Sequence, residues 1–255
     1  MKFIRALFPA VAALVLTGCA AGFEEELSSS ELTVHQLENR MRQAMDPTGR
    51  FVNAKTYVMR QQISTSRGWL EPPLLQMVEV KFRRPDQFKL TTYTDNDPET
   101  SIIVNGSSGW IVDVKRKKIT KLNEEALSRV LVMAKLTNPG SKLGNVFDKV
   151  SIDRSRVDGE DFFRLTCENN GRKPIYIYVD TKEYLNRRMR MRFEFNGGRG
   201  GFDYDSQMLK YSMYEGVRIP DESIIRQAGV EQTSKVIYYK LDVSLEDNDF
   251  RPPLF

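Results

Sequence analysis

Met189-Arg190-Met191-Arg192-Phe193-Glu194-Phe195 is the stretch that decides the fold, because apolar and charged residues alternate strictly along it. A helix would spread its four apolar side chains around the surface, whereas a strand places all of them on one face. The segment therefore predicts a β-strand whose odd-numbered side chains face an apolar interior and whose arginines face outward.

The same period of two recurs along most of the chain, and turn signals such as Asn105-Gly106 and Asp158-Gly159 separate several of the segments. The further segments with this pattern are 56–65, 76–82, 87–93, 100–104, 109–114, 161–167, 174–180, 207–214 and 233–243. The pattern predicts a mainly β protein with a single strongly curved antiparallel sheet of about ten or eleven strands, an open or half barrel.

Two segments have helical spacing instead. Residues 31–45 predict an N-terminal amphipathic helix, which Asp46-Pro47 ends. Residues 123–137 predict a helix that is apolar around most of its circumference, with Leu127, Val130, Leu131 and Ala134 on its main stripe. Such a helix must be covered on more than one side. Two interpretations remain open for it: a core helix, or a plug or lid over a cavity.

The N-terminus carries a targeting signal. Lys2 and Arg5 precede an apolar stretch that is too short to remain as a membrane-spanning helix, and this layout is typical of a secretory signal peptide. The stretch ends in Leu16-Thr17-Gly18-Cys19, which resembles the bacterial lipobox, where the cysteine thiol receives a diacylglyceryl group before cleavage. The resemblance implies a signal peptide over residues 1–18 and a lipid anchor on Cys19.

The segment after Cys19 completes the predicted organisation. In Gram-negative lipoproteins an Asp after the cysteine is the signal for retention in the inner membrane. The resemblance to these proteins therefore implies that Ala20 favours the outer membrane in a host with two membranes, with the body of the protein in the periplasm. Residues 19–30 are small, acidic and serine-rich, and we expect them to form the acylated N-terminus and a flexible tether. Residues 31–255 then form one domain.

Charge and composition argue against several functions. Removing Lys2 and Arg5 with the signal lowers the net charge from +4 to +2, which is too weak to indicate a nucleic-acid partner. Cys167 has no partner cysteine once Cys19 is acylated, so we expect a buried thiol and no disulfide. With His35 as the single histidine, the sequence predicts no catalytic site, no metal site and no cofactor.

Several motifs together resemble the family of the lipoprotein carrier LolA and its relatives. Residues 78–90 are similar to a strand of this family, its Arg-Pro corner and the strand that follows, and residues 101–113 are similar to the next hairpin with its Trp. Residues 161–166 are similar to a later strand, and Phe250-Arg251-Pro252-Pro253 is similar to the end of the family's sequences. The resemblance covers the chain from about residue 78 to the C-terminus. It implies a curved antiparallel sheet around a helical plug, with an apolar cavity for acyl chains.

The resemblance assigns roles to particular residues. The arginine of the corner, Arg84, would reach the helical lid and help to set whether the cavity is closed. The lid would comprise Arg84 with Leu127, Val130, Leu131 and Ala134. We expect these side chains to line the cavity: Val78, Val80, Phe82, Phe88, Leu90, Trp110, Val112, Met189, Met191 and Phe193.

Two functions fit these expectations. The first is a lipid-anchored envelope protein that binds acyl chains of lipids or lipoproteins, for transport or sorting to the outer membrane. The second is an envelope sensor or interaction protein that uses the same fold to bind another envelope protein. An anchored chain cannot cross the periplasm freely, and this departs from the soluble carrier. Anchoring resembles the receptor partner LolB, which has the same fold.

Overall fold

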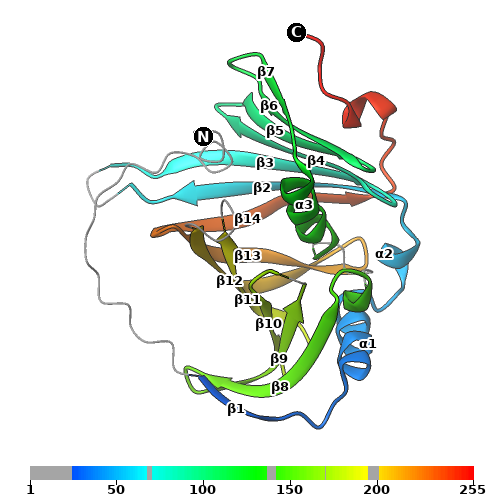
Figure 1. Cartoon of the computed structure of the whole chain (residues 1–255), viewed down its shortest axis with the longest axis vertical. Helices are drawn as coiled ribbons and strands as arrows, with labels where there is room; N and C mark the ends of the chain where they lie inside the picture. The colour runs from blue at the N-terminus through cyan, green and yellow to red at the C-terminus, as the bar shows by residue number, and fades with distance from the viewer. Residues whose placement is uncertain (1–24, 68–70, 137–141, 170, 195–200) are drawn as a thin grey trace.

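The computed structural model describes residues 25–67, 71–136, 142–169, 171–194 and 201–255. These residues form one 14-stranded sheet, in which every neighbouring pair is antiparallel and which curves around helix α3 (Figure 1). Cys19 and the signal peptide lie outside the described residues, so their assignments remain predictions. The mainly β, open curved sheet predicted from the sequence is confirmed.

The strands are β1 (Glu25–Ser29), β2 (Thr56–Thr65), β3 (Leu74–Arg83), β4 (Gln87–Thr94), β5 (Asp97–Asn105), β6 (Ser108–Asp113), β7 (Lys118–Lys121), β8 (Lys149–Val157), β9 (Glu160–Glu168), β10 (Ile175–Asp180), β11 (Asn186–Glu194), β12 (Gly201–Tyr214), β13 (Val217–Gln227) and β14 (Val230–Leu241). The helices are α1 (Val34–Met45), α2 (Arg50–Asn53) and α3 (Glu124–Leu136), and short 3₁₀ turns lie at Leu143–Asn145 and Asp247–Phe250.

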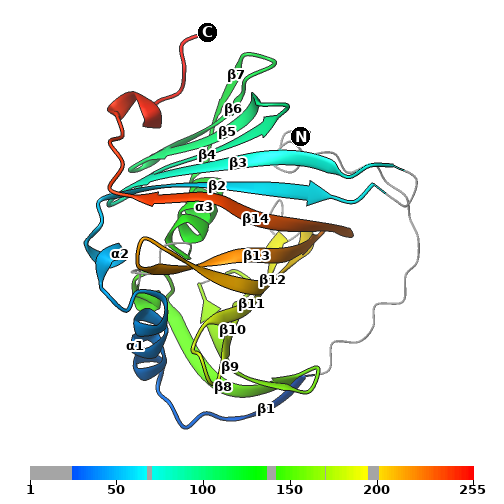
Figure 2. The ribbon, with the colours of Figure 1, turned by 180° about the vertical axis from the view of Figure 1, so that it is seen from behind.

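The order of the strands joins two halves of the chain. It runs β1-β8-β9-β10-β11-β12-β13-β14-β2-β3-β4-β5-β6-β7, so β2 pairs with the last strand, β14, in the middle of the sheet. Strands β1 and β7 are the two edges, and the sheet stays open (Figure 2). Its curvature leaves a concave side on which α3 lies.

Four strands were not predicted from the sequence. Strand β7 has only four residues, and two of them are lysines. Strand β13 contains Pro220, which argues against a strand in a sequence pattern. Strand β8 alternates only weakly, and β1 is mostly acidic and serine-rich.

The predicted flexible tether is wrong for residues 25–29, which form β1 along the edge of β8. Glu25 explains why so polar a segment is ordered. Its carboxylate accepts a hydrogen bond from Ser155 at 2.6 Å and pairs with Arg164 at 3.1 Å, where both charged side chains are largely buried. Main-chain pairing with an exposed edge strand and this ion pair fix the segment in place.

The interior has two main clusters of buried side chains. The first core cluster lies under β2–β5, β13 and β14 and includes Tyr57, Val80, Phe82, Phe88 and Tyr239. The second core cluster lies under β8–β11 and includes Phe163, Leu165, Ile177, Met189 and Met191. Helix α1 contributes Leu37, which is completely buried, to the second core cluster.

The C-terminal turn covers part of the outer face. Lys81 Nζ lies 2.6 Å from an Asp249 carboxylate oxygen, and the Arg83 guanidinium contacts Asp247 at 2.5 Å. Phe250 is fully buried, with the Arg83 guanidinium 5.1 Å from the centre of its ring. Both faces of the sheet are therefore buried near β3–β5.

Candidate functional site

Helix α3 lies between the two core clusters. Leu127, Val130 and Leu131 pack against the first core cluster, and Ala134 is buried within it. On the other side of the helix, Val132, Met133 and Leu136 pack against the second core cluster. The prediction that this helix is covered on more than one side is confirmed.

The local sequence explains where α3 begins and how closely it packs. The Asn123 side chain accepts a hydrogen bond from the Ala126 amide at 2.8 Å, and Glu124 and Glu125 lie in the first turn, where the helix dipole favours acidic groups. Gly109 on β6 leaves room for the helix. A Cβ atom at this position would lie 2.8 Å from the Cδ1 atoms of both Leu122 and Leu127.

We expect Gly109→Ala to destabilise the protein by about 1 kcal/mol, because the ends of the Leu122 and Leu127 side chains have to shift to make room for the added methyl group. The free energy of unfolding in urea measures this. Gly144→Ala is the matched control, because a Cβ atom there meets nothing within 4 Å. Equal stability of the two variants would contradict the close packing of α3.

Seven of the ten residues predicted to line the cavity lie on the concave face. Val78, Val80, Phe82, Phe88 and Leu90 belong to or pack against the first core cluster. Met189 and Met191 belong to the second. The strand register pairs Arg188 and Arg190 with Tyr178 and Tyr176, so these arginines lie on the opposite, outer face, as predicted.

The predicted position of Trp110 and Val112 on the concave face is wrong. Trp110 pairs with Ile103 and Val112 with Ser101, whereas Val104, the neighbour of Phe88 in the core, pairs with Gly109. Paired residues share a face, so both side chains point to the outer side of the sheet. The side chain of Phe193 lies outside the described residues.

Arg84 does not take the position predicted for it at the lid. Its Nε atom donates to the Ala54 carbonyl at 2.8 Å and its Nη2 atom to the Phe51 carbonyl at 3.1 Å. These carbonyls lie at the end of α2, and the guanidinium also lies 5.8 Å from the centre of the Phe51 ring. Arg84 therefore holds α2 against the sheet, because a cation at a helix C-terminus satisfies its carbonyls.

The concave face is not apolar throughout, and this was missed from the sequence. Gln76, Ser206, Gln227, Gln232 and Ser234 are buried polar residues in register with apolar inner-face positions. Gln227 donates to Gln232 at 3.1 Å and Gln232 to Thr65 at 3.0 Å. The signal was present, since these residues occupy inward positions of the period-two pattern.

Asp221 is a buried carboxylate on this face. It accepts hydrogen bonds from Tyr214 at 2.6 Å and from Ser212 at 3.0 Å, and Lys210 lies 3.4 Å away. Burial alone raises the pKa of Asp221, but the hydrogen bonds and Lys210 outweigh it, so the pKa is lowered overall.

A lowered folded-state pKa stabilises the protein above the unfolded-state pKa, near 4, and this contribution is lost as the pH falls through the folded-state value. We therefore expect Asp221→Asn to lower the free energy of unfolding more at pH 7 than at pH 3. Urea titrations at the two pH values measure the difference. An equal loss at both would show that the charge of Asp221 contributes nothing.

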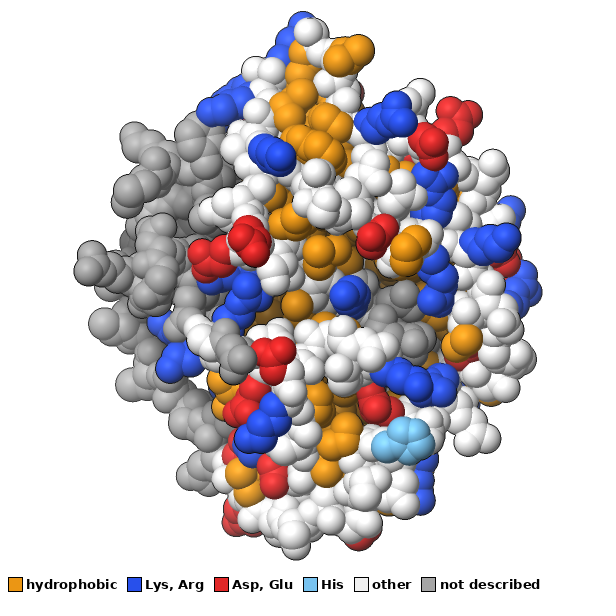
Figure 3. All heavy atoms as spheres, turned by 45° about the vertical axis from the view of Figure 1, so that its right-hand side comes forward, with side chains coloured by type: hydrophobic (Ala, Val, Ile, Leu, Met, Phe, Trp, Pro, Cys, Tyr) orange, Lys and Arg blue, Asp and Glu red, His pale blue; other side chains and the backbone are white. Residues whose placement is uncertain are grey.

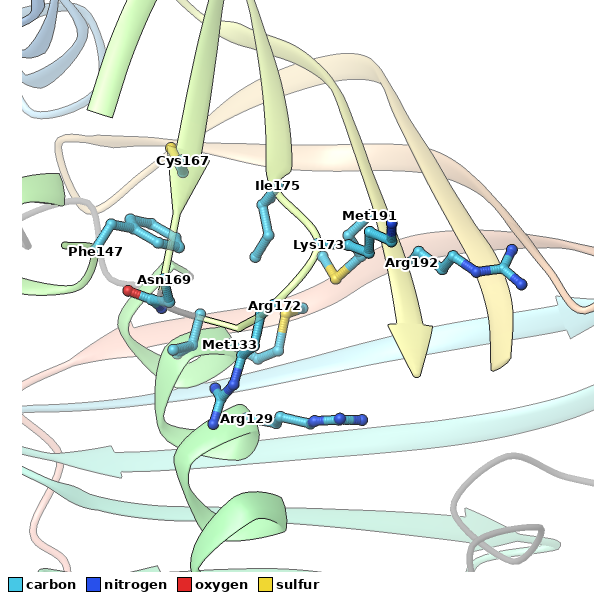
Figure 4. A pocket seen from close by; sticks show the side chains of 11 residues that line it. Arg129, Met133, Phe147, Cys167, Asn169, Arg172, Lys173, Ile175, Met191 and Arg192 are labelled. Atoms are coloured by element: carbon cyan, nitrogen blue, oxygen red, sulfur yellow. The ribbon is translucent and has the colours of Figure 1, made fainter. Parts of the chain in front are cut away.

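A pocket of about 60 Å³ lies beside α3, between the helix and strands β9–β11 (Figure 4). Its apolar side chains are Val132 and Met133 from α3, Phe147, Ile175 from β10 and Met191 from β11, together with the buried Cys167 from β9. Its polar lining consists of Arg129, Asn169, Arg172, Lys173 and Arg192.

Cys167 is a buried, inert thiol, as predicted. It is 1% exposed, and burial together with the nearby charge of Glu38 raises its pKa to about 12. The thiolate is therefore not formed near neutral pH. Among the described residues, no group of three or more His, Cys, Asp or Glu side chains is placed to hold a metal ion.

Figure 3 shows one side of the molecule, on which apolar side chains lie interspersed with lysines and arginines. None of the helices in the described ranges has the length and the apolar character needed to cross a membrane.

Comparison with solved structures identifies the fold. A LolA superfamily protein from Nitrosomonas europaea has a TM-score of 0.59 and 14% sequence identity, and the match covers 87% of this chain and 98% of that one. The chain shares the LolA fold. An outer membrane lipoprotein-sorting protein domain from Vibrio parahaemolyticus has a TM-score of 0.53 and 13% identity, covering 86% of this chain and 95% of that one.

A DUF1329 family protein from Desulfovibrio piger is also similar, with a TM-score of 0.57, 13% identity and coverage of 86% and 95%. No protein-family model matches the sequence, and no curated protein matches it either. The LolA-like hairpins predicted from the sequence are present as β3–β4 and β5–β6.

Proposed function

We propose that this protein is a lipid-anchored protein of the bacterial envelope that binds acyl chains of lipids or acylated proteins between α3 and the concave face of the sheet. Its role would be transport or sorting of these molecules to the outer membrane. The proposal is one of binding rather than catalysis, since an acyl chain needs a dry apolar surface and no reacting group.

The position of α3 carries this proposal. Seven apolar side chains of the helix face the two core clusters, yet only Ala134 is fully buried among the residues of α3. A helix that contacts both halves of the core without being enclosed can shift at lower cost than a strand of the sheet. An acyl chain could then replace α3 against the same apolar wall.

The size of the pocket explains why α3 has to move. A pocket of about 60 Å³ holds only a few methylene groups, whereas sites for lipid-sized ligands are several hundred Å³, about 300–1,000 Å³. Met133 from α3 and Met191 from β11 both line the pocket. Methionine side chains are flexible and repack around apolar ligands, so the pocket can widen as α3 shifts.

The proposed location rests on the N-terminal sequence. Cys19 would carry the acyl groups, and two or more acyl chains give stable membrane attachment. Five residues separate Cys19 from Glu25, where β1 begins, and the six residue steps between the two span at most about 20 Å. The domain would therefore stay close to its membrane. The fold shared with a lipoprotein-sorting domain supports a role in the envelope.

Native mass spectrometry of the chain without residues 1–19 tests the proposal. We expect a fraction of the purified protein to carry a lipid, and added fatty acid to convert the rest to a one-to-one complex. Protein that stays free of lipid at every fatty acid concentration would contradict the proposal.

A second candidate function, binding of another envelope protein, is favoured by a different surface. Leu209 and Met213 on β12 and Ile237 on β14 are each more than half exposed. Strands β12 and β14 lie on either side of β13, and exposed apolar side chains that gather in one region mark interaction sites in soluble domains. Cross-linking in cells, with Met213→Glu as the disrupted variant, distinguishes this function, because that substitution leaves the region of α3 unchanged.

A further inference from the structure

The pocket beside α3 combines an apolar interior with a cationic entrance. Phe147, Ile175, Met191 and Met133 form the apolar part (Figure 4). Arg129 from α3 and Arg172 from the segment between β9 and β10 lie at the side of the pocket next to the helix, and Lys173 from the same segment lies near Met191. Arg192 also lines it, but its guanidinium points away in Figure 4 and pairs with Asp203 at 3.0 Å.

Two of the three cations at the entrance have no carboxylate partner among the described residues. Arg129 pairs with Glu125 at 2.5 Å, one helical turn earlier. Arg172 donates from Nη1 to the neutral Ser128 hydroxyl at 3.2 Å. Lys173 is exposed. Arg172 and Lys173 therefore carry charges that no described carboxylate pairs with, and an anion placed there would be attracted.

We propose that this pocket binds an amphiphile with a single acyl chain and an anionic head group, a carboxylate or a phosphate. The chain enters the apolar interior between Met133 and Met191, and the head group lies at Arg129, Arg172 and Lys173. Charge-assisted hydrogen bonds from guanidinium groups to carboxylate or phosphate oxygens are among the strongest in proteins. This inference rests on the proposed function, and it adds the chemistry of the head group.

The geometry favours an amphiphile over a free ion or a peptide. Phe147 and Met191 are buried whereas Lys173 is exposed, so a bare phosphate ion would reach the cations but leave the apolar interior empty. The arginine on α3 also links the head group to the helix that has to shift. Binding of the anionic head group at the cations and the shift of α3 would then occur together when the ligand binds.

Displacement of a fluorescent fatty acid measures the preference. The full chain carrying Cys19→Ser is titrated with dodecanoate, dodecyl phosphate and the uncharged dodecanol. We expect the two anions to bind about tenfold or more tightly than dodecanol. The stronger of the two anions identifies a carboxylate or a phosphate head group. Two variants are compared with this parent: a double variant that combines Arg129→Gln and Arg172→Gln, and the single variant Lys173→Gln. Lys173 is exposed, so its substitution should leave folding unaffected.

In the double variant we expect the anions to bind no more than about twofold more tightly than dodecanol, and in Lys173→Gln an intermediate preference. Arg116→Gln, at an exposed arginine in the turn between β6 and β7, is the matched control and keeps the full preference. Equal affinity of the parent for all three ligands, or an unchanged preference in Lys173→Gln and the double variant, overturns the inference but leaves acyl-chain binding intact. Failure of all three ligands to bind overturns the proposed function as well.

Discussion

Leu131→Glu is expected to weaken fatty acid binding at least about tenfold while lowering the melting temperature by less than about 4 °C. Leu131 lies on α3 and packs, half-buried, against the first core cluster. We expect a carboxylate at this half-buried position to reach solvent when no ligand is bound, and to contact the acyl chain once α3 has shifted away from the first core cluster. Desolvating an unpaired charge against an acyl chain costs several kcal/mol.

The alternative that α3 is simply a core helix makes the opposite prediction. An unpaired charge buried in a core costs an amount comparable to the whole stability of a domain, so the melting transition of Leu131→Glu would collapse. Binding of a fluorescent fatty acid and thermal unfolding are measured on the same preparation. Ile119→Glu on β7, a position 39% exposed, is the matched control for the added charge and should change neither.

Cys19→Ser is expected to abolish incorporation of labelled palmitate completely, because the lipobox resemblance makes the Cys19 thiol the site of acylation. A larger share of the variant than of the parent should also be found in the soluble fraction, because the acyl chains that hold the protein at the membrane are missing. Metabolic labelling with a clickable fatty acid, followed by fractionation, measures both effects.

Cys167→Ser is the control for Cys19→Ser, since it removes the other cysteine, whose thiol is buried and protonated. It should incorporate label like the parent. Label that persists in Cys19→Ser, or that is lost in Cys167→Ser, contradicts the assignment of the anchor to Cys19.

Strands and helices with a strong period were predictable from the sequence, and α3 is the clearest example. Its apolar residues cover most of the helix circumference, and the structure places them against two separate clusters. Strands β7 and β1 were not predictable, because they gain their stability from pairing at an edge. For β1, the burial of Glu25 with Arg164, 139 residues away, is not visible in a local pattern.

The faces of the strands show a second limit of the sequence. Alternation shows that Trp110 and Val112 share a face, but not which face is concave. The register across the turn at Gly106 decides that, by pairing Val104 with Gly109 and Ile103 with Trp110. An apolar side chain on the outer face is also expected where another element covers it, as the turn of Phe250 covers part of the outer face near β3–β5.

Arg84 illustrates how a motif can be right while the role carried with it is wrong. The Arg-Pro corner between β3 and β4 is present, but the guanidinium donates to carbonyls at the end of α2. That short helix has no counterpart in the pattern read from the sequence. The contact depends on a segment 30 residues earlier in the chain, and local spacing does not reveal it.

Photolabelling with a fatty acid that carries a diazirine near the end of its chain tests the central claim most directly. After irradiation of the complex, peptide mass spectrometry identifies the residues that the chain end reached. Our account predicts labelled peptides from α3 (Glu124–Leu136) and from the facing strands β3 and β11. Label confined to outer-face peptides such as β7 would contradict it. So would labelling that excess unmodified fatty acid does not reduce.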